Sequence, residues 1–379
     1  MGFIFWIFFI LIAYTCAGYP FLLLVLSKGM RKPVERVACE PTVTVILSAF
    51  NEEKHIEAKL CNLLDMDYPD EKIEILVGSD GASDATDEII SKIRSPRVRF
   101  FRFVSNLGKP SVLNALVQEA HGSVLIFTDA RQAFDRQAIR MLVRNFSDPA
   151  VGCVSGELYF KNETKGRIEK GMDAYWCYEK FLRRNESEIG SMLGATGAIY
   201  AIRRELYAKL PVNILVDDMY IPLQIVSRGY RAVFESEAEA YDRPSTKSRE
   251  ELKRKVRTLA GNYQIFFLLP RLLVPGKSPV AWQLISHKLM RLLIPFFLFG
   301  FFSANLFLLR SGMYRLVLAA QFLFYGLAAW EWYSEKKGLG KKSIGYIPYM
   351  FCLLNYCAFV ALIRFLQGRQ KAAWERAYA

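Results

Sequence analysis

Four long apolar segments constrain this chain more than any other feature, because each is long enough to cross a lipid bilayer as a helix. They cover residues 2–27, 285–309, 313–333 and 344–366. Basic residues follow the first segment at once, at positions 28–36, and such residues are enriched on the cytoplasmic side of membranes. The sequence therefore predicts an integral membrane protein whose middle part lies in the cytoplasm.

The first segment is expected to remain as an uncleaved anchor over residues 1–30. No basic residue precedes it, and it is longer than the apolar core of a typical signal peptide. His287, Lys288 and Arg291 lie where the second segment enters the bilayer. Their side chains either snorkel to the lipid headgroups or line a polar path, and we favour snorkelling.

The remaining segments predict three C-terminal transmembrane helices within residues 285–366. Lysines at 336–342 place the loop at 334–343 inside, which agrees with three crossings. The same parity puts the basic tail, residues 367–379, outside, so either one segment is re-entrant or the tail is an exception to the charge rule. Residues 251–277 mix basic and aromatic side chains, which predicts an amphipathic helix on the cytoplasmic leaflet or a solvated helix.

Between the membrane segments, residues 41–250 form one expected α/β domain. Short apolar runs rich in β-branched residues are typical of buried parallel strands, and each is followed by a helical pattern. This alternation predicts a mostly parallel sheet with helices on both faces. The expected strands cover residues 42–47, 73–77, 97–103, 123–128 and 229–234, and the expected helices cover residues 55–64, 84–93, 111–120 and 218–227.

Charge and cysteine content narrow the class of protein. The chain has a net charge of +13, which suits an anionic lipid surface or an anionic substrate. Nucleic acid is a distant alternative, because the sequence has no zinc-finger spacing and no basic region backed by heptads. The seven cysteines include no CxxC pair, which argues against a zinc site or a disulfide scaffold.

The strand at 123–128 ends in Asp129. Ligands of open α/β sheets bind where the strands end at their carboxyl edge. A carboxylate there either holds a divalent cation against a diphosphate or caps the next helix. Asn51 and Asp80 follow two other expected strands, and Asn51 is a candidate cap for the helix after it.

Four motifs in this order resemble those of family 2 glycosyltransferases, which are inverting enzymes that use nucleotide sugars and have a GT-A fold. They are Ala49-Phe-Asn-Glu-Glu53, Ser79-Asp-Gly-Ala-Ser-Asp84, Asn106-Leu-Gly-Lys109 and Thr128-Asp-Ala130. The resemblance continues through Gly194-Ala-Thr-Gly197, Val216-Asp-Asp218 and Arg254-Lys-Val-Arg257, so it covers residues 41–265. It implies a Rossmann-like GT-A domain joined to transmembrane α-helices, as in the membrane-bound, polysaccharide-type branch of the family.

The resemblance also implies roles for single residues. Asp218 would be the general base that takes the proton of the acceptor hydroxyl, and Asp217 would orient it. The family's glycine motif places Gly194, Thr196 and Gly197 on the acceptor side. Residues expected to bind the donor are Ala49, Asn51, Glu52 and Asp80 around the uracil base, and Lys109, Asp129, Arg131, Arg254 and Arg257 near the ribose and diphosphate.

Two departures from the family pattern affect these expectations. The usual Asp-x-Asp metal motif reads Asp129-Ala-Arg131 here. Either Asp129 and the diphosphate hold Mg²⁺ or Mn²⁺ with waters, or Arg131 takes over part of the charge neutralisation. Thr258 stands where the family has a tryptophan, which weakens the case for processive synthesis.

We therefore expect a glycosyltransferase in a bacterial inner or plasma membrane that moves a sugar from a UDP-sugar to a growing exopolysaccharide or a lipid-linked glycan. One alternative acceptor is a simple membrane lipid, as for ceramide glucosyltransferases. The alternative from another class is an inactive, membrane-anchored nucleotide-binding regulator. The sequence leaves the sugar, the linkage and the oligomeric state open.

Overall fold

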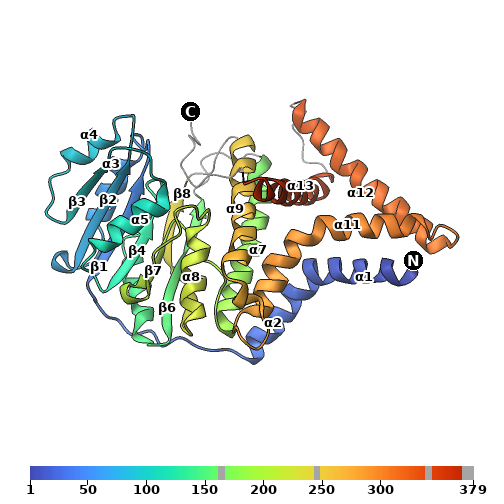
Figure 1. The fold of residues 1–379 in the computed structure, drawn as a ribbon, viewed down its shortest axis with the longest axis horizontal. Helices are drawn as coiled ribbons and strands as arrows, with labels where there is room; N and C mark the ends of the chain where they lie inside the picture. The colour runs from blue at the N-terminus through green and yellow to red at the C-terminus, as the bar shows by residue number, and fades with distance from the viewer. Residues whose placement is uncertain (161–166, 243–247, 338–343, 369–379) are drawn as a thin grey trace.

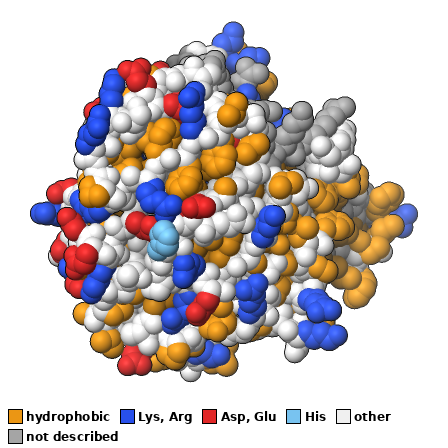
Figure 2. Space-filling model, turned by 60° about the vertical axis from the view of Figure 1, so that its left-hand side comes forward, with side chains coloured by type: hydrophobic (Ala, Val, Ile, Leu, Met, Phe, Trp, Pro, Cys, Tyr) orange, Lys and Arg blue, Asp and Glu red, His pale blue; other side chains and the backbone are white. Residues whose placement is uncertain are grey.

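The computed structural model describes residues 1–160, 167–242, 248–337 and 344–368. A sheet covered by helices occupies one side of the molecule, and long apolar helices occupy the other (Figure 1). Two helices, α7 (Arg167–Ile189) and α9 (Ser248–Leu268), stand between these parts (Figure 1). In Figure 2, charged side chains are spread over the sheet domain, and hydrophobic side chains gather toward the right-hand edge.

The sheet has eight strands in the order β3-β2-β1-β4-β7-β6-β8-β5. Strands β1, β2, β3 and β4 are mutually parallel, as the sequence predicts. The sheet is mixed because β7 runs antiparallel to both β4 and β6, and β5 runs antiparallel to β8. The strands are β1 (Val43–Ala49), β2 (Ile73–Asp80), β3 (Val98–Phe103), β4 (Val124–Thr128), β5 (Ala133–Phe134), β6 (Val151–Phe160), β7 (Tyr200–Arg203) and β8 (Arg231–Asp242).

Two apolar cores, one on each face, hold helices against this sheet. Alternate residues of a strand point to opposite faces, so Ile46 of β1 belongs to one core and Leu47 to the other. The core of Ile46 is completed by α5 (Lys109–Gln118), α8 (Asp217–Ser227) and part of α9. The core of Leu47 is completed by α3 (Ile56–Leu64), α4 (Thr86–Lys92) and α6 (Ala138–Val143). The predicted arrangement of helices on both faces is thereby confirmed.

Within the described residues, four helices are long and apolar enough to cross a membrane, which confirms the expected membrane segments. They cover Gly2–Gly29, Ala281–Leu306, Gly312–Lys336 (α12) and Tyr346–Leu366 (α13). The first joins α1 (Gly2–Ala13) and α2 (Tyr19–Gly29) through a π-helical turn, Tyr14–Gly18, and the second joins α10 (Ala281–Gln283) and α11 (Met290–Leu306) through another, Leu284–Leu289. The tail at 369–379 lies outside the described residues.

The expectation of snorkelling side chains at the start of the second membrane segment is wrong. His287 is only 2% exposed, and its Nδ1 lies 2.7 Å from Oε1 of Glu186 on α7. Arg291 pairs with Glu179, and Lys288 Nζ lies 3.6 Å from the same carboxylate. These side chains turn inward because the buried carboxylates of Glu179 and Glu186 need cationic or hydrogen-bonding partners. They join the membrane segment to the sheet domain.

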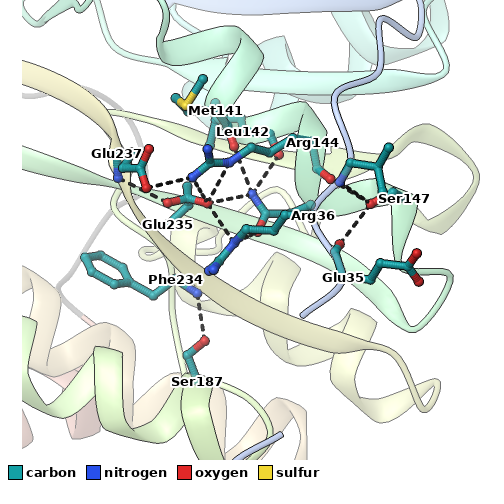
Figure 3. A network of polar contacts seen from close by, with 12 residues as sticks. Glu35, Arg36, Met141, Leu142, Arg144, Ser147, Ser187, Phe234, Glu235 and Glu237 are labelled. Atoms are coloured by element: carbon teal, nitrogen blue, oxygen red, sulfur yellow. Dashed lines mark hydrogen bonds and ion pairs between the residues drawn. The ribbon is translucent and has the colours of Figure 1, made fainter. Parts of the chain in front are cut away.

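A second polar cluster fixes the connection between the first membrane segment and the sheet (Figure 3). Glu235 of β8 is buried, and its Oε2 lies 3.1 Å from Nε of Arg36 and 3.0 Å from Nη2 of Arg144. Asn145 donates to the same oxygen at 3.1 Å. A buried carboxylate needs such partners, so this cluster holds the connecting segment at one place on the sheet domain.

Helix α9 covers most of the segment that was expected to lie on the membrane surface. It ends at Leu268, and a 3₁₀ turn, Pro270–Leu273, follows. Val256, Ala260 and Tyr263 are buried in the core that also contains α8. Much of its apolar face is therefore used within the protein, while Phe267 is 71% exposed. Contact with the cytoplasmic leaflet remains a prediction for this exposed end.

Candidate active site

The carboxyl ends of β1, β2 and β4 bring the predicted donor-binding residues to one edge of the sheet. Ala49 is the buried last residue of β1, and Asn51 follows it with a φ of 55°. Asn51 Oδ1 accepts a hydrogen bond from the backbone N–H of Ser83, 2.8 Å away. The expectation that Asn51 caps the next helix is therefore wrong. Its side chain instead ties the turn after β1 to the turn after β2.

Asp80, the last residue of β2, organises the loop that follows β3. Its two carboxylate oxygens accept hydrogen bonds from the backbone N–H groups of Leu107, at 2.6 Å, and Gly108, at 2.9 Å. Burial raises the pKa of Asp80, and the two N–H groups act in the opposite direction. Gly108 has a φ of 84°, which favours glycine, and it leads directly into Lys109 at the start of α5. Asp80 thus fixes the position of Lys109.

Lys109 links the two acidic parts of the site. Its Nζ lies 3.0 Å from Oδ1 of Asp129 and 3.3 Å from Oδ2 of Asp217. Burial disfavours the charged ammonium, but Asp129, Asp217 and Asp218 outweigh this effect and raise the pKa of Lys109. A fixed positive charge therefore lies between the end of β4 and the start of α8.

Asp217 and Asp218 form the first turn of α8, where the helix dipole favours negative charge. The backbone oxygen of Asp218 accepts a hydrogen bond of 2.7 Å from the N–H of Ala195. A Cβ atom at Gly197 would lie 3.1 Å from Oδ2 of Asp218, so the glycine leaves room for this carboxylate. Burial, followed by the charge of Asp217, raises the pKa of Asp218 to about 6. This carboxylate can accept a proton near neutral pH.

The other acceptor-side residues surround this carboxylate. Thr196 donates its backbone N–H to Oγ of Ser155 at 2.9 Å, and its hydroxyl accepts a hydrogen bond from Arg183. Gly194 packs against Met219, to which a Cβ atom would come within 3.5 Å. The segment that contains Gly194, Thr196 and Gly197 therefore lies against the start of α8. Sequence reasoning missed Arg183, because no motif includes it.

Arg131, which replaces the second acid of the metal motif, is held by a residue far away in the sequence. Its Nη2 lies 2.6 Å from Oδ2 of Asp242 at the end of β8, and Nε2 of Gln132 donates to the same oxygen at 2.8 Å. Asp242 is buried and orients the Arg131 guanidinium. No sequence signal pointed to Asp242, since 111 residues separate this pair.

Glu52 and Lys59 surround the Asp129 turn from the β1 side. Burial, followed by the charge of Asp129, raises the pKa of Glu52 to about 7. Lys59 is 2% exposed and donates to the backbone oxygen of Gln132 at 2.7 Å. Burial lowers the pKa of Lys59 to about 7. Sequence reasoning missed Lys59, whose position in a helical pattern resembles that of a surface lysine.

Arg254 and Arg257 lie on α9, and this helix is fixed to the segment before Asp217. Oε1 of Gln264 accepts from the N–H of Leu215 at 3.0 Å, and its Nε2 donates to the backbone oxygen of Asn213 at 2.9 Å. A Cβ atom at Gly261 would lie only 2.7 Å from the methyl groups of Val216. The two arginines are therefore carried by a helix that touches the segment leading to Asp217, and their contact with a donor remains a prediction.

A mixed α/β sheet with acidic residues at the ends of β2 and β4 and a carboxylate pair at the start of α8 defines a GT-A glycosyltransferase domain. Residues 44–210 match the model of glycosyl transferase family 2. This matched part of the chain is therefore a family 2 glycosyltransferase domain, and the residues that the structure describes also include four candidate membrane-spanning helices.

Two curated relatives are similar to part of this chain. A probable glycosyltransferase from Bacillus subtilis is 24% identical over 295 residues, which are 75% of this chain and 69% of that protein. A poly-β-1,6-N-acetyl-D-glucosamine synthase from Staphylococcus aureus is 27% identical over 200 residues, 51% of this chain. The match spans 48% of the synthase, about half of its length.

A solved structure has the same fold over nearly the whole chain. It is a mannosyltransferase from Pyrobaculum calidifontis in complex with GDP-mannose and Mn²⁺. The two chains superpose with a TM-score of 0.72 at 22% identity, over 97% of this chain and 99% of the other. This likeness extends to the membrane-spanning part and concerns the fold.

The residues at the end of β4 suit a cation that the donor helps to bind. Among the residues that the structure describes, no group of three or more His, Cys, Asp or Glu side chains is placed to hold a metal ion. Asp129 offers one carboxylate whose side chain is 36% exposed. Mg²⁺ is commonly bound by one or two carboxylates together with phosphate oxygens, so this single carboxylate fits a site completed by a diphosphate.

Proposed function

We propose that this protein transfers a sugar from a UDP-sugar, with inversion, to a hydroxyl group of a growing exopolysaccharide or a lipid-linked glycan. The observation that carries the proposal is the position of Lys109, which contacts Asp129 at the proposed diphosphate end and Asp217 beside the proposed base. A cation for the leaving diphosphate and a carboxylate for the acceptor proton therefore lie close together, and a displacement at the anomeric carbon uses both.

In this reaction the acceptor oxygen attacks the anomeric carbon. Asp218 takes the proton of the acceptor hydroxyl as the new C–O bond forms, and the bond from the anomeric carbon to the diphosphate oxygen breaks. The nucleoside diphosphate leaves with the electron pair of that bond. Lys109 and Arg131 stabilise the negative charge that grows on it. A divalent cation, held by Asp129 and the diphosphate, would supply further charge neutralisation.

We propose a UDP-sugar because the Asp80 carboxylate can accept a hydrogen bond from the uracil N–H, and the turn that joins Asn51 to Ser83 lies at the same edge of the sheet. Purified protein in detergent, offered UDP- and GDP-sugars in turn, should release UDP from one of the UDP-sugars, and mass analysis should identify the product. Release of GDP alone would exclude UDP-sugars as donors. Release of neither nucleotide would support the alternative of an inactive nucleotide-binding regulator.

The acceptor is proposed to be associated with the membrane, because α2 and α13, which belong to candidate membrane-spanning helices, pack against α7 and α9 of the catalytic part. The similarity to a polysaccharide synthase supports a glycan rather than a simple lipid. Incubation with membranes and a labelled donor should yield a labelled polymer or lipid-linked glycan. A labelled monoglycosyl lipid as the only product would contradict the glycan proposal.

A further inference from the structure

Arg183, which no sequence motif identifies, is a cation near the proposed catalytic base Asp218. It lies on α7, and its guanidinium donates to the hydroxyl of Thr196. We propose that Arg183 is a positioning residue for the Asp218 carboxylate, which it serves by holding Thr196 in the segment that surrounds this carboxylate. This inference rests on the proposed function, because it assigns Arg183 to the base of that reaction.

The segment held by Arg183 touches Asp218 on both sides of Thr196. The preceding residue, Ala195, donates its N–H to the backbone oxygen of Asp218 at 2.7 Å. The following residue, Gly197, lies so close to Asp218 that a Cβ atom added to it would be 3.1 Å from Oδ2 of the carboxylate. A displacement of Thr196 would therefore change the contacts of Ala195 and Gly197 with Asp218. Ser155 holds Thr196 at its backbone N–H, and Arg183 holds it at its hydroxyl.

Arg183 can act as an anchor because α7 is itself fixed on the side of the membrane-spanning helices. One turn after Arg183, Glu186 is fully buried and accepts a hydrogen bond of 2.7 Å from the hydroxyl of Tyr19 on α2. His287 Nδ1 lies 2.7 Å from the same oxygen. Two membrane-spanning segments therefore meet at a single carboxylate on α7.

The same helix is fixed on the side of the sheet. Ser187 Oγ accepts a hydrogen bond of 2.9 Å from the N–H of Phe234 in β8 (Figure 3). On the membrane side, α7 has a further contact, because the hydroxyl of Ser27 at the end of the first membrane segment donates to Oδ1 of Asn185 at 2.6 Å. Because buried hydrogen bonds of this kind are costly to break, α7 provides a rigid base for the Arg183 side chain. Arg183 thus connects the membrane-spanning helices to the acceptor side of the site.

The charge of Arg183 has a consequence that a neutral anchor would not have. Burial, Asp217 and Asp129 raise the pKa of Asp218, and Lys109 and Arg183 lower it. Without Arg183 the carboxylate should hold its proton to a higher pH. A base must be ionised to accept a proton, so activity would be lost mainly at low pH and recovered as the pH rises.

The test compares Arg183→Met, Arg183→Lys and Thr196→Val with a matched control, Arg184→Met, in the full-length protein. Arg184 is an exposed neighbour on the same helix. Turnover is measured from pH 5 to pH 9 as UDP released from the UDP-sugar that gives product in the donor screen, together with UDP affinity and the midpoint of thermal unfolding. In Arg183→Met, the pH at which turnover is half-maximal should rise by about one unit. Turnover at pH 6 should therefore fall by about fivefold. UDP affinity should stay within about twofold.

The other variants separate charge from anchoring. Arg183→Lys keeps the charge, so its pH profile should stay near that of the unchanged protein, whereas Thr196→Val should lower turnover at every pH. In the double variant Arg183→Met with Thr196→Val, the effects should be less than additive, because the two side chains act through one hydrogen bond. Arg184→Met should show neither change.

An unshifted pH profile in Arg183→Met, with turnover equal to that of Arg184→Met, would overturn the inference. If Arg183→Met does not fold, a pH profile shifted in Arg183→Lys, or additive effects of Arg183→Lys and Thr196→Val, would overturn it instead. Failure of the proposed function gives a different result. Normal turnover in Asp218→Asn would show that Asp218 is not the base and would contradict the proposed function. Loss of turnover in Asp218→Asn, together with normal turnover in Arg183→Met, would contradict only the proposed role of Arg183.

Discussion

Lys109 shows how one side chain can define a site at the scale of single residues. Its ammonium group connects Asp129 with Asp217, and its position is set by the hydrogen bonds from Leu107 and Gly108 to Asp80. The carboxylate pair on α8 gains from this fixed charge, since Lys109 favours ionisation of Asp218 against burial and the charge of Asp217. The first three predictions concern this group of residues.

Replacement of the base should remove turnover without removing donor binding. Asp218→Asn cannot accept the acceptor proton, so turnover should fall by about 10²–10⁴-fold while UDP affinity stays nearly unchanged. In the unchanged protein, turnover should rise with pH through about 6, because the raised pKa of Asp218 leaves the carboxyl protonated below that value. Steady-state kinetics across pH and calorimetry with UDP would test both. Near-normal turnover in Asp218→Asn would contradict the assignment.

Replacement of Asp80 should weaken the donor site in two ways. Asp80→Ala removes the proposed contact with uracil and leaves the N–H groups of Leu107 and Gly108 without their acceptor. A hydrogen bond to a charged group contributes about 1.5–3 kcal/mol, so loss of the contact with uracil should lower UDP affinity by about tenfold or more. Calorimetry with UDP measures the loss. An unchanged affinity would leave Asp80 as a turn residue only.

The dependence on metal should reflect the single carboxylate at the end of β4. We expect that activity needs added Mg²⁺ or Mn²⁺, that Asp129→Ala abolishes it, and that the metal binds more tightly when UDP is present. Arg131→Asp should raise metal affinity in the absence of UDP, although it also breaks the pair with Asp242. Calorimetry with Mn²⁺, with and without UDP, provides a readout besides activity. Full activity in excess chelator would show that Lys109 and Arg131 suffice.

At the scale of elements, α9 links the membrane-spanning helices to the catalytic pair. It packs on α13 at one face, where the rings of Tyr263 and Phe365 stack. Through the side chain of Gln264 it also forms hydrogen bonds with the backbone of Asn213 and Leu215. The close approach of Gly261 to Val216 leaves no room for a side chain. The position of the turn that carries Asp217 therefore depends on a helix that is distant in sequence.

A methyl group at this contact should disturb catalysis more than folding. Gly261→Ala forces α9 and Val216 apart, and a displacement of about 1 Å near catalytic groups can cost about 10²-fold in rate. Turnover should fall while the thermal midpoint changes little. The control is Gly326→Ala on α12, where a Cβ atom would meet nothing within 4 Å. Equal turnover in the two variants would show that this contact does not position the site.

At the scale of the whole molecule, polar contacts join the sheet domain to the membrane-spanning helices. Glu186 is in hydrogen-bond contact with Tyr19 and His287, which belong to two membrane segments. Glu235 forms an ion pair with Arg36, which lies in the connection after the first segment (Figure 3). These buried charges are expensive to leave unpaired, so the two parts should move as one unit during catalysis.

The side of the membrane on which the sheet domain lies can be tested with thiol labelling. In a variant that keeps only Cys61, an exposed residue of α3, an impermeant maleimide should react after cell lysis and not before. A single cysteine at Ser311, between α11 and α12, should react in intact cells, because one crossing separates the two positions. Labelling of Cys61 in intact cells would place the domain outside and remove its access to cytosolic nucleotide sugars.

The sequence by itself determined the membrane segments, the four parallel strands and the residues at their carboxyl ends. Each of these depends on local patterns: apolar length for a membrane helix, and a short apolar run with a polar turn for a buried strand. It did not predict α7, β6 or β7, since β7 pairs antiparallel with strands that are distant in the chain. Propensity within a short window carries no information about such partners.

Only the tertiary structure decided which polar residues act together. Asn51 was expected to cap a helix and instead holds Ser83, and His287 was expected to reach headgroups and instead meets Glu186. The partners of Arg131 and Thr196, which are Asp242 and Arg183, come from elements that no motif connects to them. Burial is the physical reason, because a charge or hydroxyl removed from water must bind whatever partner the fold brings near, and sequence spacing does not reveal that partner.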